Sequence, residues 1–417
     1  MGSFVAKSWQ RVLGSPALAA LRHRNFRLFY FGQIVSLIGF WMQNVALAWV
    51  VLELTNSPFL LGVVTFVQFV PNLLFSLVAG VITDRWPRRS IVIGTQVSFM
   101  LLALVLTLLS FNGLLNYWHI IALSLLMGIF HAIDIPARQS FLVEMVGRED
   151  LSNAIALNSS MFNSARIIGP ALGGIILAHY GASTCFLINT ASFFFVIVGL
   201  MLMKLEKIKR VIDSKNIIDQ IKTGIKYILS TPGVYIPMGL LASLSISAMN
   251  FGVLIPVFAR DILFQGPEGF GGLVSALGAG SLAGAIGLVI LSGKQYQLKF
   301  LWSGAVGLAV FELFLGFTNW YWLAALFLIG AGWSMVTVSA SVNSIIQAQV
   351  PDNLRGRVMS VYSLSFIGLS SLGGMLAGAV AKLFGASLAF TVSGTLALTA
   401  TLVMARKWHL LKAQQEV

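Results

Sequence analysis

Charged residues are scarce in this sequence. They make up 10% of its 417 residues, and hydrophobic residues make up 57%, whereas a soluble domain carries about 25% charged residues. Cysteine is scarcer still, because Cys185 is the single one. One cysteine excludes an intrachain disulfide and a cysteine-cluster metal site. Together these absences exclude a soluble globular protein and predict a chain that lies within a membrane.

Acidic residues are also few, with 14 Asp and Glu against 27 Lys and Arg and a formal net charge of +13. The apolar runs between the charges are long enough to span a bilayer, which takes about 20 residues per helix. Their ends, marked by charged and turn residues, predict an all-α membrane protein with twelve transmembrane helices. The predicted spans cover 27–52, 59–82, 91–111, 118–137, 154–179, 183–203, 234–259, 270–291, 299–317, 321–346, 358–381 and 386–405.

The basic residues follow the order of these spans. If the two termini share one side, 24 of the 27 lie on that side, in the tails and the even-numbered loops. Because Lys and Arg are enriched in cytoplasmic loops, we expect a multi-pass protein of the bacterial inner (cytoplasmic) membrane with both termini in the cytoplasm. A nucleic-acid partner is disfavoured, since the charge excess follows loop parity rather than forming one patch.

The chain resembles itself at an offset of about 204 residues. Residues 169–174 (GPALGG) align with 373–378 (GGMLAG), and a Gly-Ala-Ser at 181–183 aligns with another at 385–387. Span five therefore matches span eleven, so that six helices repeat as six.

This repeat predicts an N-terminal six-helix half at 1–203, a cytoplasmic linker at 204–232 and a C-terminal six-helix half at 233–417. Isoleucines recur in the linker at helical spacing among lysines, which indicates an amphipathic helix on the inner membrane surface. They are Ile217, Ile218, Ile221, Ile225 and Ile228. A solvated linker with some helix is the alternative.

Two parallel six-helix repeats around a central cavity are the architecture of major facilitator transporters, and the loop after span two resembles that superfamily. Such transporters carry a Gly-x-x-x-Asp-Arg-x-Gly-Arg-Arg motif there. This sequence has Gly80-x-x-x-Asp84-Arg85-x-x-Arg88-Arg89, with Pro87 in place of the usual glycine. The resemblance implies a conformational latch, in which Asp84 contacts the positive N-terminal end of span eleven when the halves close on the inside. The alternative is that the arginines only enforce topology.

Span five resembles the antiporter motif of proton-driven exporters. The sequence reads Ala165-x-x-x-Gly169-Pro170-x-x-Gly173-Gly174, with alanine where a glycine is usual. A Gly-Pro pair kinks a helix, and the two later glycines allow a partner helix to press close. The resemblance implies that this surface seals the contact between the halves and suppresses leak.

Three further segments resemble the branch of the superfamily that contains enterobactin exporters and macrolide efflux proteins. They are 134–139 (DIPARQ), 148–154 (REDLSNA) and 350–358 (VPDNLRGRV).

Ionisable residues within the spans are functional candidates, because charge in hydrocarbon is costly. His131, Asp134 and Arg138 share one face of span four, and Arg166 lies in span five. Together they predict a charge network or a proton-coupling site. A buried pair of Asp134 with Arg166 is one hypothesis, and pairing with Arg88 or Arg138 in the inner latch is the other. His131 is expected to form hydrogen bonds rather than to carry the proton.

The resemblance implies that spans one, four, seven and ten line the substrate cavity. The polar and aromatic candidates on and beside them are Gln33, Gln43, Asn44, Asn163, Asn250, Trp333, Asn343 and Tyr362. Aromatic and amide groups with few fixed charges suit a bulky amphipathic organic molecule better than a small ion. Hydrogen bonding between helices is the alternative role for each residue.

The resemblance thus implies a secondary active transporter, specifically a proton-coupled antiporter that exports a hydrophobic or amphipathic compound such as a drug, a macrolide or a siderophore. A lipid or lysophospholipid transporter of the same fold is the alternative. An enzyme is disfavoured, because the five histidines are scattered and lack a His-Glu-x-x-His motif. The expected partners are the substrate, protons and the bilayer, with no metal and no cofactor, and the chain is expected to be a monomer.

Overall fold

Helices form every regular element of the computed structural model, which describes residues 16–204, 217–290 and 294–415. The first part of the chain forms a short 3₁₀ turn and five long helices. They are η1 Pro16–Arg22, α2 Arg24–Thr55, α3 Pro58–Arg85, α4 Arg88–Phe111, α5 Tyr117–Val146 and α6 Leu151–Met201. The backbone of α6 leaves helical geometry at Gly181, so this long element contains two spans.

The second part of the chain is also helical but contains two interruptions. Its elements are α7 Ile217–Ser230, α8 Pro232–Ser247, α9 Phe251–Asp261, α10 Pro267–Ile290, α11 Lys294–Phe317, α12 Tyr321–Gln349, α13 Asp352–Ser363, η2 Leu364–Gly368, α14 Leu369–Phe384 and α15 Ala386–Gln415. Predicted span seven is broken between α8 and α9. Span eleven runs through α13 and α14 with a π-helical turn, η2, between them.

The predicted all-α membrane architecture is confirmed. Within the described ranges, ten segments are long and apolar enough to cross a membrane. Dividing α6 at Gly181 and adding α3, whose apolar part is Pro58–Asn72, accounts for the twelve predicted spans. The candidate spans of the sequence therefore correspond to helices of the structure.

Two glycines at matching places of the repeat end their spans in the same way. Gly181 has a φ of +79° and Gly385 a φ of +85°. Side chains disfavour this left-handed region, whereas glycine adopts it freely. The aligned Gly-Ala-Ser segments thus mark the same turn, once inside α6 and once between α14 and α15.

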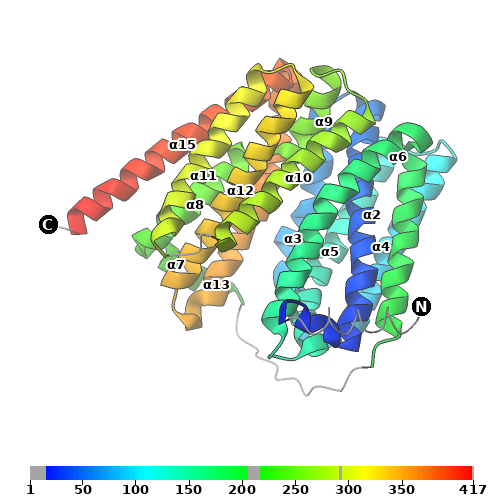
Figure 1. Cartoon of the computed structure of the whole chain (residues 1–417), viewed down its shortest axis with the longest axis horizontal. Coiled ribbons are helices and arrows are strands. Elements are labelled where there is room, and N and C mark those ends of the chain that lie inside the picture. The colour runs from blue at the N-terminus through cyan, green and yellow to red at the C-terminus, as the bar shows by residue number, and fades with distance from the viewer. Residues whose placement is uncertain (1–15, 205–216, 291–293, 416–417) are drawn as a thin grey trace.

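The spans gather into two groups (Figure 1). Helices α2–α6 pack together, and α8–α15 form the other part of the molecule. We call them the N-terminal group and the C-terminal group. We also call the end at which α3 meets α4 and α5 meets α6 the basic end, and the end at which α2 meets α3 the opposite end.

The buried apolar core shows where the two groups join. One cluster combines residues of the C-terminal group with N-terminal residues near the opposite end, such as Leu52, Leu61 and Phe186. A second cluster, around Phe26 and Phe141, lies near the basic end and contains residues of the N-terminal group alone. The groups therefore share a core at the opposite end and have separate surroundings at the basic end.

Glycines make the contact between the groups close. A Cβ added at Gly174 of α6 would lie 2.7 Å from the Pro267 carbonyl oxygen and 3.1 Å from Gly271 Cα of α10. Ser275 of α10 also donates a hydrogen bond to the Ile167 carbonyl oxygen at 2.8 Å. Backbone thus packs directly on backbone where α6 crosses α10.

The repeat-related crossing of α3 and α14 is built in the same manner. A Cβ at Gly62 would lie 2.8 Å from the Gly374 carbonyl oxygen, and one at Gly378 would lie 2.5 Å from the Pro58 carbonyl oxygen. The small residues that revealed the sequence repeat are therefore the ones that join the two groups.

Arg260 adds a polar contact at the opposite end. Its Nη1 donates to the Leu52 carbonyl oxygen at 3.1 Å and its Nη2 to Asn56 Oδ1 at 2.9 Å, while its Nε bonds Asp261 at 2.6 Å. The side chain of α9 thereby holds the end of α2.

The predicted amphipathic helix of the linker is present as α7. Its Tyr227 hydroxyl donates to the Gln349 carbonyl oxygen at 3.2 Å, and Gly224 lies against Arg357 of α13. Ile228 is buried and Ile225 is exposed; the side chains of Ile217, Ile218 and Ile221 lie outside the described residues. The helix therefore docks on the C-terminal group.

Substitution of Gly174 with alanine should lower the thermal stability of the purified protein. The new Cβ meets backbone that has no room to give way, and overpacking of this kind costs about 1–3 kcal/mol. Thermal unfolding in detergent measures the effect. Gly94→Ala is the matched control, because its Cβ would meet nothing within 4 Å. Equal unfolding midpoints for the two variants would contradict the packing argument.

Candidate functional site

A cavity of about 390 Å³ lies inside the N-terminal group. Helices α2 to α6 all contribute to its wall, with Gln33 and Trp41 from α2, Gln68 from α3, Gln96 from α4, Asp134 from α5 and Phe162 from α6 among the lining residues. Most of the wall is apolar or aromatic, and the polar part consists mainly of amides. This composition is typical of a binding site for a small organic molecule.

Three polar atoms of the wall lack a hydrogen-bond partner among the described residues. They are Gln33 Oε1, Trp41 Nε1 and Gln96 Oε1, all of them buried. Buried polar atoms are normally paired, since an unpaired one costs about 1–3 kcal/mol. One donor and two acceptors without a partner therefore belong to residues that line the same cavity.

The charged part of the wall is centred on Asp134. Its side chain is 3% exposed. Thr95 donates to Oδ1 at 2.6 Å, Gln96 donates to the same oxygen at 3.3 Å, and Arg138 Nε donates to Oδ2 at 3.0 Å. Arg138 lies one helical turn after Asp134 on α5, so the ion pair forms within one helix. The costly burial of this carboxylate is thus offset by three donors.

Arg166 does not belong to this network, and the predicted pairing of Asp134 with Arg166 is wrong in this structure. The Arg166 guanidinium lies over the Trp41 ring, 5.8 Å from its centroid. Its backbone carbonyl faces Gly278 of α10. The intrahelical partner Arg138 satisfies Asp134 without a long reach between helices, which is why the alternative pairing forms.

His131 completes the face that carries Asp134. Its ring lies 4.5 Å from the Phe99 ring and 5.6 Å from the Phe40 ring, measured between centroids. Phe99 also stacks on Phe193 at 6.0 Å. The histidine is therefore one member of an aromatic wall that faces the cavity.

The predicted latch loop contacts residues of the N-terminal group, as far as its side chains are described. Arg88 Nη1 bonds Glu144 Oε1 at 3.0 Å, and Arg89 donates to the carbonyl oxygens of Leu200 and Met201 at 2.8 and 2.9 Å. These bonds tie the start of α4 to the ends of α5 and α6. Side-chain contacts at Gly80, Asp84 and Arg85 lie outside the described residues.

The antiporter motif divides its contacts between the two groups. Gly169 and Gly173 face α2, because their added Cβ atoms would lie 2.5 Å from Trp41 Cβ and 3.0 Å from Met42 Cα. Pro170 and Gly174 face α10. This surface thus packs on both sides, and its sealing role stays a prediction.

Three of the predicted cavity residues on α2 and α6 do not line this cavity. Gln43 accepts a hydrogen bond from Asn189 at 2.7 Å, in the buried contact between α2 and α6. Asn163 donates to the Ser159 carbonyl oxygen of its own helix at 2.9 Å. Asn44 is partly buried and is absent from the lining as well. Gln33 is the predicted residue that the structure brings to the cavity.

The predicted residues of the C-terminal group also lie elsewhere. Asn250 caps the break between α8 and α9 and donates to the Ile246 carbonyl oxygen at 2.9 Å. The Trp333 backbone packs on Gly284 of α10. Asn343 accepts from Gln347 at 2.6 Å, and the Tyr362 hydroxyl donates to the Ser339 carbonyl oxygen at 3.0 Å. Their role as substrate ligands stays a prediction.

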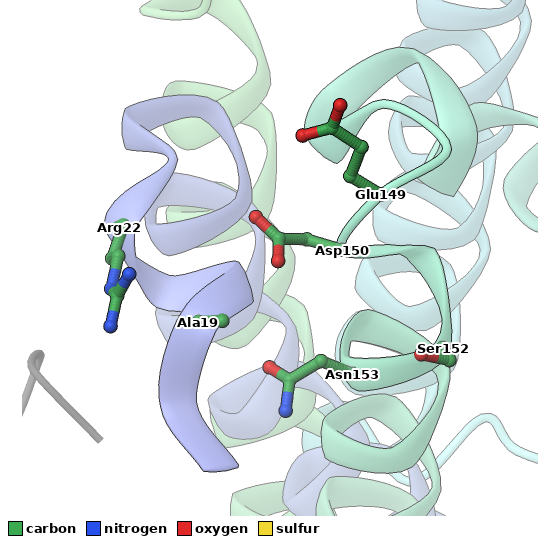
Figure 2. Close-up of a pocket in the computed structure, with 6 residues that line it drawn as sticks. All are labelled: Ala19, Arg22, Glu149, Asp150, Ser152 and Asn153. Carbon is green, nitrogen blue, oxygen red and sulfur yellow. The ribbon is translucent and has the colours of Figure 1, made fainter. Parts of the chain in front are cut away.

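A second, polar pocket at the basic end has a structural explanation (Figure 2). Its lining comes from η1 and from the start of α6, and Asp150 and Asn153 point toward η1. His23 Nε2 lies 2.7 Å from Asp150 Oδ2, and the Ala20 N–H donates to Asn153 Oδ1 at 2.9 Å. These bonds anchor the chain before α2. Nowhere in the described part of the chain do three His, Cys, Asp or Glu residues gather in a way that could hold a metal.

Sequence reasoning missed Thr95 and Gln96, the two α4 residues that bond Asp134. It assigned the cavity to spans one, four, seven and ten, which left span three out. A Thr-Gln pair in the middle of an apolar run was the available signal, since adjacent polar residues there need partners on a neighbouring helix.

Several known proteins are similar in sequence to this chain over most of its length. The staphyloferrin A transporter of Staphylococcus aureus is 28% identical over 391 residues, which are 90% of this chain and 94% of the relative. The multidrug efflux pump Tap of Mycolicibacterium fortuitum is 24% identical over 86% of this chain and 89% of the relative. Macrolide efflux protein A of Streptococcus pyogenes is 20% identical over 92% and 96%.

The fold is shared with solved transporters. The crystal structure of a POT family transporter in complex with 5-aminolevulinic acid superposes with a TM-score of 0.75 at 12% identity, covering 92% of this chain and 95% of that one. The sequence also matches the family described as transmembrane secretion effector over residues 15–416. The predicted resemblance is thus confirmed, and the chain is a multi-pass membrane transporter rather than an enzyme. It belongs to the transmembrane secretion effector family of the major facilitator superfamily.

Proposed function

We propose that this transporter exports a bulky amphipathic organic compound in exchange for protons, by alternating access across the bacterial inner membrane. The observation that carries the proposal is the cavity of about 390 Å³, whose wall combines the buried Asp134–Arg138 ion pair with Gln33, Trp41 and Gln96, each of which has one unpaired polar atom. The names of two relatives, a multidrug efflux pump and a macrolide efflux protein, support the direction and the class of substrate.

The chemistry of the wall argues for the substrate class. Aromatic side chains such as Phe40, Phe99 and Phe162 offer apolar area, while the amides and the indole offer a few hydrogen bonds. A small ion would need a dense set of charged ligands, which this wall lacks among its described residues. A molecule with a large apolar body and a few polar groups matches both features.

The conformation fits the inward-facing state of an alternating-access cycle. The basic end carries most of the Lys and Arg residues, so that it faces the cytoplasm by the positive-inside rule. The close crossings of α6 with α10 and of α3 with α14 then close the outer side. In the outward-facing state these crossings separate, and the latch residue Asp84 meets the C-terminal group.

Asp134 is the proposed proton site. In its charged form this carboxylate can accept a hydrogen bond from a polar group of the substrate, in addition to those it accepts from the protein. A proton on the carboxylate would remove this acceptor and its negative charge, and so displace the bound group. Proton and substrate would thus exclude each other at one side chain, which is the requirement for antiport.

Transport into proteoliposomes should test the function directly. The panel contains a siderophore, a macrolide, a cationic dye and a lysophospholipid, each with and without an imposed proton gradient. We expect the gradient to accelerate uptake of at least one of the first three. An uptake rate that does not depend on the proton gradient would refute proton coupling. Transport of the lysophospholipid alone would favour the alternative function, lipid transport.

Asp134→Asn should abolish the effect of the proton gradient on transport. Asparagine keeps the shape of the side chain and one acceptor oxygen, but it cannot exchange a proton. The same proteoliposome assay measures uptake with and without the gradient. Asp150→Asn is the matched control, because Asp150 pairs with His23 outside the cavity. A gradient response of normal size in Asp134→Asn would exclude Asp134 as the proton site.

Arg260→Gln should increase the fraction of molecules in which the two groups are separated at the opposite end. The substitution removes charged hydrogen bonds to Leu52 and Asn56, each worth about 1.5–3 kcal/mol. A cysteine at position 57, in a Cys185→Ser background, reports the opening through its rate of labelling by a membrane-impermeant maleimide. We expect an increase of at least about tenfold, which is the factor that the loss of one such bond would produce.

Lys382→Gln is the control for this measurement, since it removes the same charge at the same end from an exposed position. Equal labelling rates in the Arg260 and Lys382 variants would show that Arg260 does not hold the groups together.

A further inference from the structure

A second hollow, of about 480 Å³, lies on the membrane-facing side of the N-terminal group at the basic end. We call it the lateral groove. Its apolar walls are Leu28, Phe31 and Val35 of α2 and Phe195, Val198 and Leu202 of α6. Arg24 and Arg27, at the start of α2, also line it. The groove is separate from the substrate cavity, with which it shares no lining residue.

Two glycines create the lateral groove. A Cβ added at Gly32 would lie 3.0 Å from the Phe195 carbonyl oxygen, and one added at Gly199 would lie 2.8 Å from the Leu28 carbonyl oxygen. The two helices therefore cross with no side chains between them. The larger residues on either side project beyond the two glycines and form the walls of the groove. Phe31, Phe195 and Leu202 are 51%, 57% and 52% exposed. Their apolar surface is exposed on the outside of the helix group.

The two arginines of the groove are available for an anion. Among the residues that the structure describes, neither side chain has a hydrogen bond or an ion pair, and no acidic residue lines the groove. Arg89, at the same end, is instead bound to the carbonyl oxygens of Leu200 and Met201. Two free guanidinium groups beside an exposed apolar furrow combine a phosphate-binding and an acyl-binding surface.

We propose that the lateral groove binds an anionic phospholipid. The phosphate lies between Arg24 and Arg27, and an acyl chain follows the apolar floor toward Val35. The position of the lateral groove suits a phospholipid. Its arginines are at the end of the helices, where lipid headgroups lie, and its apolar part extends toward the hydrocarbon region of the bilayer. A competing occupant would be the segment of residues 1–15, but it contains no acidic residue and two basic ones, Lys7 and Arg11.

The lipid would brace a junction of the transporter. Asn25, between the two arginines, donates to the Lys204 carbonyl oxygen at 2.7 Å and accepts from the Lys204 N–H at 3.2 Å. Lys204 is the first residue of the predicted linker. A phospholipid held at Arg24 and Arg27 thus stabilises the point at which the N-terminal group is tied to the linker.

Native mass spectrometry of the full-length protein in detergent tests the site. The protein is titrated with phosphatidylglycerol and with phosphatidylcholine of the same acyl chains. We expect tighter binding of phosphatidylglycerol, and the double variant Arg24→Gln/Arg27→Gln should weaken it about 25-fold, from about fivefold per arginine. Binding of phosphatidylcholine should stay unchanged.

The control Arg148→Gln/Arg406→Gln removes the same charge from exposed positions outside the groove. It should retain phosphatidylglycerol. Val35→Trp fills the furrow but keeps both arginines, and it should also weaken binding. Equal affinity for the two lipids, equal losses in the two double variants, or undiminished binding to Val35→Trp would overturn the proposal.

Discussion

Direct packing of backbone on backbone between the two helix groups is the contact on which this architecture depends. The hydrophobic effect does not pull helices together inside a bilayer, so close approach and the dispersion energy that comes with it must do so. Glycines at Gly62, Gly174 and Gly378 provide that approach at two crossings related by the sequence repeat. The shared core and the Arg260 contacts follow from it, because both need the opposite end to be closed.

The polar chemistry of the membrane interior is distributed unequally. The described cavity, the Asp134–Arg138 pair and the unpaired atoms of Gln33, Trp41 and Gln96 all belong to the N-terminal group. In the C-terminal group, the buried carboxylate Glu312 lies on a face of α11 with Leu308 and Leu315 and has no hydrogen-bond partner among the described residues. The two groups are therefore similar in topology but not in chemistry.

The fold could be predicted from the sequence because its signals are local. Apolar runs, their boundaries and the glycine turns at 181 and 385 each depend on a few neighbouring residues, and the structure places helices where they indicated. The breaks in spans seven and eleven were not predicted. At one break the Asn250 side chain bonds the Ile246 carbonyl oxygen at the end of α8, and no proline or charged residue marks the π-helical turn η2.

The site was less predictable because it depends on the rotation of each helix. Gln33 and Gln43 lie ten residues apart on one helix, yet one lines the cavity and the other bonds Asn189 between α2 and α6. Helical spacing groups residues on a face but does not say which neighbour that face meets. The choice of Arg138 over Arg166 as the partner of Asp134 has the same origin.

The position of that partner constrains how a proton site at Asp134 can work. Thr95, Gln96 and Arg138 all belong to the N-terminal group, as Asp134 does, so a rocking motion between rigid groups leaves every one of these bonds in place. Movement of the groups alone cannot then drive the proton on or off. What would change during the proposed cycle is the content of the cavity and the side from which water enters it. At the proposed proton site, exchange would therefore be controlled by the substrate and by access, and the Asp134 carboxylate is the group for which substrate and proton would compete.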